Sequence, residues 1–146
     1  MKIQKSIEIA AVAEKVWPFL VEPAHIMKWC RNVKIVLHTS EQTSGLRTPF
    51  YFEERAVGRM MKLHFVVTEW EVNRSVAYKM TSGNFVKGYE QKYTLEPNPT
   101  GIRLTCFEHV TLPFGIMGKC AEVFRRPVSA AHVNRMLVNL KNLGEA

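Results

Sequence analysis

A single glutamate interrupts an apolar row in the segment RLTCFEHVTLP (103–113). Every second residue of this segment forms the row Leu104, Cys106, Glu108, Val110 and Leu112. A strand that turns this row toward the interior would bury a carboxyl group, which must then be paired, hydrogen-bonded or protonated. A carboxyl group with a raised pKa can donate or accept protons near neutral pH. Glu108 is therefore the first candidate for chemistry.

Three environments are compatible with Glu108. The side chain faces a cavity and anchors or protonates a ligand, or it pairs internally with a Tyr, Gln or Arg, or it reaches solvent near the strand end. Glu54 is a second candidate of the same kind, because it follows Phe50 and Phe52 on the apolar row of an earlier segment.

Polar-tipped side chains also lie on the apolar rows of other segments. Glu69 belongs to such a row, although a bulge beside Trp70 would turn it to the other face. The candidates for lining a pocket are Phe52, Glu54, Phe65, Tyr78, Tyr89, Gln91, Tyr93 and Glu108. Apolar walls with a few convergent polar groups are typical of small-molecule sites. The alternative is that these residues form an ordinary aromatic core.

Metal and cofactor motifs are missing from the sequence. The five histidines show no HxH or HExxH spacing, and the three cysteines show no CxxC spacing. Phosphate-binding glycine loops and the GxSxG motif are also absent, and the sequence contains no Asp. We therefore expect neither a metal nor a cofactor.

The composition is that of a globular protein with a basic surface. The formal charge is +7, from 20 Lys and Arg against 13 Glu, but the basic residues are scattered. A solvated surface is thus favoured over nucleic-acid binding, while peripheral contact with an anionic membrane stays open. The sequence has no run of about 18 apolar residues and no secretory signal, so we expect a cytoplasmic protein with reduced thiols.

Hydrophobic periodicity predicts the elements that must position these side chains. Residues 2–11 alternate as a strand, and residues 11–30 fit two short helices with a break near Glu22 and Pro23. A short strand is predicted at 33–38. Five alternating segments then follow on short turns, as in an antiparallel meander, at 48–57, 60–72, 75–81, 86–96 and 102–112.

The remainder of the chain is predicted to be a long helix. Its apolar face changes phase near Pro127, from a face with Met117, Cys120 and Val128 to one with Val133, Met136, Leu137 and Leu140. Because a proline removes one helical hydrogen bond, we expect a kink or break between Arg126 and Ser129.

This order of elements resembles the START-like (SRPBCC) superfamily. The resembling phrases are AEKVWPFLVEP with the later KW, then SGNFVKGYEQKYTLEPNPTGIRLTCFEHVTLP, and finally HVNRMLVNLKNLGEA. The chain looks most similar to the polyketide cyclase/dehydrase-like branch. The resemblance implies an α+β helix-grip fold over residues 1–146 as a single ligand-binding domain. A curved antiparallel seven-stranded sheet would wrap around a long C-terminal helix, with two short helices between strands 1 and 2.

The same resemblance implies a hydrophobic cavity between the sheet and the helix. Trp29 would lie at its rim and Phe124 at its lid. The first function that we expect is binding or carriage of a lipid, quinone, sterol or polyketide-like molecule, which requires a sizeable internal cavity. The chain would act as a monomer or homodimer.

Two other functions are considered. One is a cyclase or dehydratase that uses Glu108 or Glu54 as general acid or base with a tyrosine as helper. No cyclase set of catalytic residues maps onto this sequence position by position, so no catalytic residue is assigned. The other is docking of the basic surface to RNA, a ribosome or an anionic membrane, which would weaken steeply with salt.

Overall fold

The computed structural model describes residues 1–56, 58–113 and 115–146, except for the side chains of 116, 118, 119 and 121–124. The strands are β1 (Lys2–Ile9), β2 (Val33–His38), β3 (Pro49–Ala56), β4 (Arg59–Glu71), β5 (Ser75–Gly83), β6 (Gly88–Asn98) and β7 (Gly101–Thr111). The helices are α1 (Ala13–Val21), α2 (Pro23–Trp29) and α3 (Gly115–Glu145). Helices α1 and α2 lie between β1 and β2, as predicted.

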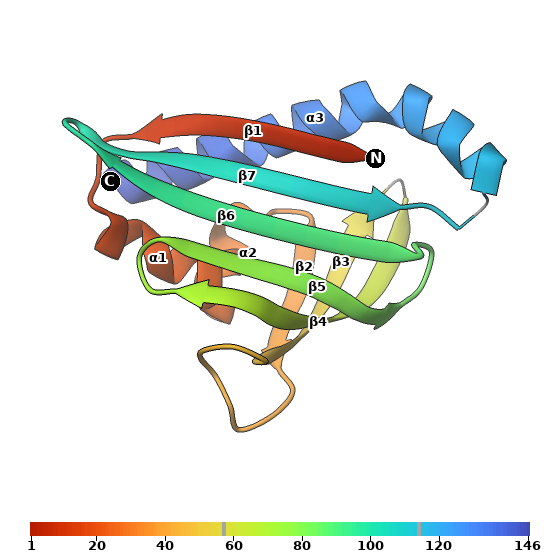
Figure 1. Ribbon diagram of the computed structural model, residues 1–146, viewed down its shortest axis with the longest axis horizontal. Coiled ribbons are helices and arrows are strands. Elements are labelled where there is room, and N and C mark those ends of the chain that lie inside the picture. Colours follow the sequence, from red (N-terminus) through yellow and green to blue (C-terminus); the bar gives the residue numbers. More distant parts are fainter. Residues whose placement is uncertain (57, 114) are drawn as a thin grey trace.

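The seven strands form one antiparallel sheet in the order β1-β7-β6-β5-β4-β3-β2. Each strand from β2 to β7 pairs with its neighbour in sequence. Strand β1 pairs with β7 and forms one edge of the sheet, and β2 forms the other. In Figure 1, β2 and β3 run steeply across the direction of β6 and β7, so the sheet is strongly twisted. The helix-grip fold is confirmed.

Alternation along the strands decides which side chains enter the core. In β7, Ile102, Leu104, Cys106 and Glu108 are buried, while the intervening Arg103 is exposed. The turn before this strand needs a glycine, since Gly101 has a φ of 151° and a Cβ there would lie 2.1 Å from the Ile9 carbonyl oxygen. This close approach fixes the β6–β7 turn against the end of β1.

A bulge in β4 corrects the predicted position of Glu69. The register between β4 and β5 shifts between Val67 and Glu69. Glu69 consequently lies on the outer face, where its carboxylate pairs with Lys92 at 2.9 Å. Trp70 turns inward instead, and its ring meets the Trp17 ring edge-on at 5.2 Å. The inward assignment of Glu69 was therefore wrong, for the reason that a bulge changes strand parity.

A kink or break was expected between Arg126 and Ser129. Helix α3 continues through Pro127 without a break, and its ribbon is bent rather than straight (Figure 1). Its C-terminal half buries Val133, Met136, Leu137 and Leu140 against the core. The first half behaves differently: Met117 is 78% exposed and Val128 is 68% exposed. Among the described side chains of α3, the buried apolar ones thus lie in its C-terminal half.

Candidate functional site

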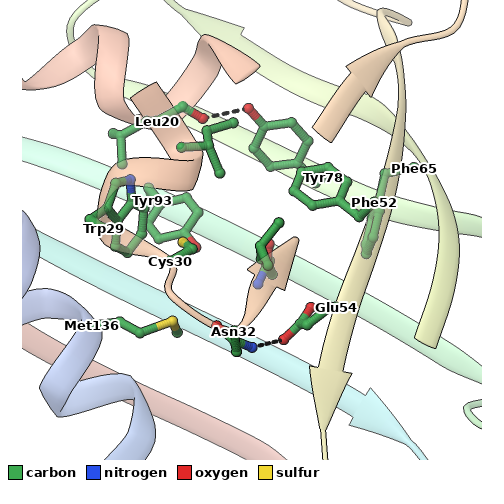
Figure 2. A pocket seen from close by; sticks show the side chains of 13 residues that line it. Leu20, Trp29, Cys30, Asn32, Phe52, Glu54, Phe65, Tyr78, Tyr93 and Met136 are labelled. Carbon is green, nitrogen blue, oxygen red and sulfur yellow. Dashed lines mark hydrogen bonds between the residues drawn. The ribbon is translucent and has the colours of Figure 1, made fainter. Parts of the chain in front are cut away.

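A cavity of about 30 Å³ lies between the sheet, the α1–α2 region and α3. Figure 2 shows side chains from these elements converging on it. We call it the inner cavity. Its described lining is Leu20, Ile26, Trp29, Cys30, Asn32, Val33, Phe52, Glu54, Phe65, Tyr78, Gln91, Tyr93 and Met136. This volume admits roughly one or two water molecules. The sizeable internal cavity expected from the sequence is therefore not found at this position.

Aromatic side chains fill most of the space between the sheet and the helices. The Phe50 ring contacts Tyr78 edge-on at 5.4 Å, and Phe52 contacts Phe65 at 5.3 Å. Phe65 in turn contacts Tyr89 at 5.5 Å. Edge-to-face pairs at these distances are favourable packing. This ring cluster explains why the inner cavity is small, and it supports the core interpretation for Phe52 and Phe65.

A larger cavity of about 270 Å³ opens to the surface beside the inner one. We call it the outer cavity. Its described apolar lining consists of Met1, Ala56, Met61, Val86, Val110, Leu112 and Val128. Tyr89 and Glu108 also line it, and Asn32 and Glu54 line both cavities. The two spaces therefore adjoin at Asn32 and Glu54, where β3 faces the turn before β2.

Glu108 is held by polar neighbours from the adjacent strand. Gln91 Nε2 donates to Glu108 Oε1 at 2.9 Å, and the Tyr89 hydroxyl donates to the same oxygen at 3.2 Å. Glu108 is only 6% exposed, so escape to solvent is wrong and internal pairing with Tyr and Gln is confirmed. Burial raises the pKa of Glu108, and the two hydrogen bonds oppose this effect.

Glu54 is a second acid whose pKa is raised in this site. Burial is the largest cause, and the nearby charge of Glu108 adds to it, raising the pKa of Glu54 to about 7. Asn32 Nδ2 donates to Glu54 Oε1 at 2.6 Å, which favours the charged form and limits the rise (Figure 2). Glu54 thus exchanges a proton near neutral pH within a pocket.

Trp29 and Tyr78 use their polar atoms to complete helix α1. The Phe19 carbonyl lies four residues before Pro23, which has no N–H to donate, and the indole Nε1 of Trp29 donates to it at 2.7 Å. The Tyr78 hydroxyl donates to the Leu20 carbonyl at 2.6 Å (Figure 2). These two residues line the inner cavity, but their hydrogen-bonding groups already serve the fold.

The structure gathers nine of the ten predicted site residues around the two adjoining cavities. Trp29, Phe52, Glu54, Phe65, Tyr78, Gln91 and Tyr93 line the inner cavity, and Glu54, Tyr89 and Glu108 line the outer one. The side chain of Phe124 lies outside the described residues. Sequence reasoning missed Asn32, His132 and Arg135. Asn32 lies in a turn, where alternation gives no signal, and the two α3 residues lie on a mostly polar helical face.

The described part of the chain holds no group of three or more His, Cys or Glu side chains arranged for a metal ion. Across the same residues, no helix is long and apolar enough to span a membrane. All three cysteines are free, and Cys30 and Cys106 are buried. Burial raises the pKa of both buried thiols, which keeps them protonated and unreactive.

A curved antiparallel sheet around a long helix, with a cavity between them, defines the START-like class. A family model described as polyketide cyclase / dehydrase and lipid transport matches residues 1–145. The chain therefore belongs to this family, which agrees with the resemblance seen in the sequence. A comparison with curated proteins finds no match.

Solved structures of similar fold come from several sources. TTHA0849 from Thermus thermophilus aligns with a TM-score of 0.82 and 17% identity, over 98% of this chain and 96% of that one. A START superfamily protein from Mycobacterium smegmatis aligns with a TM-score of 0.74 and 17% identity, over 99% of this chain and 94% of that one. The di-domain ARO/CYC StfQ of the steffimycin biosynthetic pathway aligns with a TM-score of 0.78 and 15% identity, over 99% of this chain and 50% of StfQ. At these identities the similarity establishes the fold.

Proposed function

We propose that this protein binds or carries a hydrophobic small molecule, such as a lipid, quinone, sterol or polyketide-like compound, in the outer cavity. The observation that carries the proposal is the outer cavity itself. Its apolar walls end at Tyr89, Glu108, Asn32 and Glu54, which are hydrogen-bonding groups suited to orient a ligand. The family to which the chain belongs includes lipid transport in its description, which supports the same function.

The size of the outer cavity limits the part of a ligand that is enclosed. A cavity of about 150 Å³ holds benzene, so the outer cavity encloses about ten non-hydrogen atoms by proportion. A longer ligand would extend through the open mouth. The proposed carrier acts in the cytoplasm, where its thiols would stay reduced, as a monomer or homodimer with transient membrane contact.

Native mass spectrometry of the freshly purified protein tests this function. We expect a bound species that is released on denaturation and extracts into organic solvent. Refolded protein without ligand serves as the control, and it should regain the added mass when incubated with the extract. A chain that carries no added mass, and that binds none of a panel of apolar compounds, would contradict the proposal.

The second candidate function is acid–base catalysis on a bound polyketide-like substrate. It is favoured by one observation, the pKa of about 7 at Glu54, because a general acid or base works best when its pKa lies near the working pH. Glu108 raises that pKa and is the alternative catalytic group. With a panel of linear polyketide substrates, we expect Glu54→Gln or Glu108→Gln to abolish turnover while leaving binding largely intact. Unchanged turnover in a variant would remove that residue from the role.

A further inference from the structure

We propose that the ligand of the outer cavity is an anionic amphiphile whose carboxylate or phosphate head group lies against the arginines at the mouth, with its apolar body inside. This inference rests on the proposed binding function and specifies the chemical class of the ligand. It is carried by the distribution of charge around the cavity.

The mouth of the outer cavity carries three exposed arginines. Arg55 comes from β3, and Arg125 and Arg135 come from α3, so cations approach the opening from both of its sides. None of the three forms an ion pair with another described residue. Guanidinium groups bind carboxylates and phosphates through paired hydrogen bonds, so this rim is complementary to either head group.

A surface groove continues the cationic region beyond the mouth. The groove has a volume of about 450 Å³ and shares His132 and Arg135 with the outer cavity. It adds Arg31, and its described lining contains no carboxylate. A head group larger than a carboxylate would therefore meet positive charge in either space.

One buried polar atom in the lining of the outer cavity, His132 Nε2, can donate to an anion and has no partner among the described residues. Burial and the charge of Arg135 lower the pKa of His132, so its imidazole is neutral and can donate one hydrogen bond to a head group. Buried polar atoms normally have partners, and a polar ligand atom would supply one here.

The carboxyl groups of Glu54 and Glu108 also line the outer cavity, but they are paired with other residues than the rim arginines. The groups that favour the charged form of Glu108 are Gln91 and Tyr89, and the group that does so for Glu54 is Asn32. No arginine contributes, so the rim cations are not neutralised by these acids. An anionic head group is thus attracted to the arginines of the rim, which sets the orientation of the ligand.

Probes with a common ten-carbon body and different head groups test this inference. Decanoate, decyl phosphate, decanol and decyltrimethylammonium are titrated at pH 6 and low salt by calorimetry. The wild-type protein should bind the two anions about tenfold more tightly than decanol, and the ammonium probe most weakly. The decanoate and decyl phosphate arms show which anion the rim prefers. A purely apolar cavity would instead favour the uncharged decanol.

The double variant Arg125→Gln/Arg135→Gln should lose the preference for anions while retaining its affinity for decanol. Arg103→Gln, on the exposed face of β7, is the matched control and should behave like the wild type. If decanol binds as tightly as decanoate, or if the double variant keeps the anion preference, the head-group inference is wrong and the binding function stands. If none of the four probes binds, the head-group inference and the proposed binding function are both wrong.

Discussion

Glu54 and Glu108 face one cavity from strands that are four positions apart in the sheet. Glu54 lies on β3 and Glu108 on β7, with β4, β5 and β6 between them, yet the charge of Glu108 raises the pKa of Glu54. In a flat sheet, four strand spacings would separate the two backbones by about 19 Å. The curvature of the sheet is what brings the two acids into a common site.

The raised pKa of Glu54 predicts a pH-dependent stability. Its pKa is about 7 in the folded protein, against an ordinary value of 4.5, so the folded state binds the proton more tightly. The stabilisation is present below about pH 4.5 and is lost as pH rises through 7. Relative to Glu54→Gln, the wild-type protein should lose about 3 kcal/mol of unfolding free energy between pH 4.5 and 8. Urea unfolding at several pH values measures this, and a difference that stays constant with pH would contradict it.

The hydrogen bonds to Glu108 predict a stability cost for Tyr89→Phe. This change removes a donor to Glu108 and an acceptor for Gln91, both within the buried site. We expect a loss of about 1–2 kcal/mol in unfolding free energy. Tyr51→Phe is the matched control, because it removes a Tyr–Glu53 hydrogen bond on the outer face and should cost less than Tyr89→Phe. Equal losses of unfolding free energy in the two variants would mean that the buried hydrogen bonds stabilise the fold no more than the bond on the outer face.

Tyr78 should be needed for stability rather than for ligand affinity. Tyr78→Phe leaves the buried Leu20 carbonyl without its donor, which should cost about 1–2 kcal/mol. Decanol affinity, measured by calorimetry, should stay within about twofold of the wild type. A large loss of affinity with unchanged stability would show that the hydroxyl acts on the ligand instead.

The β6–β7 turn should not tolerate a side chain at position 101. In Gly101→Ala the added Cβ would lie 2.1 Å from the Ile9 carbonyl oxygen, so the ends of β1 and β7 must separate. We expect a loss of more than about 3 kcal/mol, or no folded protein. Gly88→Ala is the control, because its Cβ would meet Thr111 at an ordinary 3.5 Å and should cost less than about 1 kcal/mol. Thermal unfolding of the two variants compares them, and a fully stable Gly101→Ala protein would contradict this account of the turn.

Alternation in the sequence was sufficient to place Glu108, because its strand has a regular period of two from Ile102 to Glu108. It failed at Glu69, where a single extra residue in β4 reversed the parity. Of the kink or break predicted between Arg126 and Ser129, the break is wrong, because α3 continues through Pro127 as a bent helix (Figure 1). A proline costs one helical hydrogen bond, and a helix packed along its C-terminal half can absorb that cost by bending.

The site itself could be predicted only in part. Alternation gave the side chains that face inward, but it carries no information on how far a sheet curves, and the meeting of Glu54 with Glu108 depends on that curvature. The carbonyl partners of Trp29 and Tyr78 likewise depend on how α1 packs on the sheet. Asn32 was missed because turn residues follow no period.

The most direct test of ligand binding in the outer cavity is to fill it. Ser129 on α3 lines the outer cavity, whereas Ala131, two residues later, is exposed and outside the lining. Calorimetric titration with decanol should show binding to the wild type and to Ala131→Phe, and at least about tenfold weaker binding to Ser129→Phe. Binding to Ser129→Phe that equals the wild type, or no binding to the wild type, would contradict the proposed site.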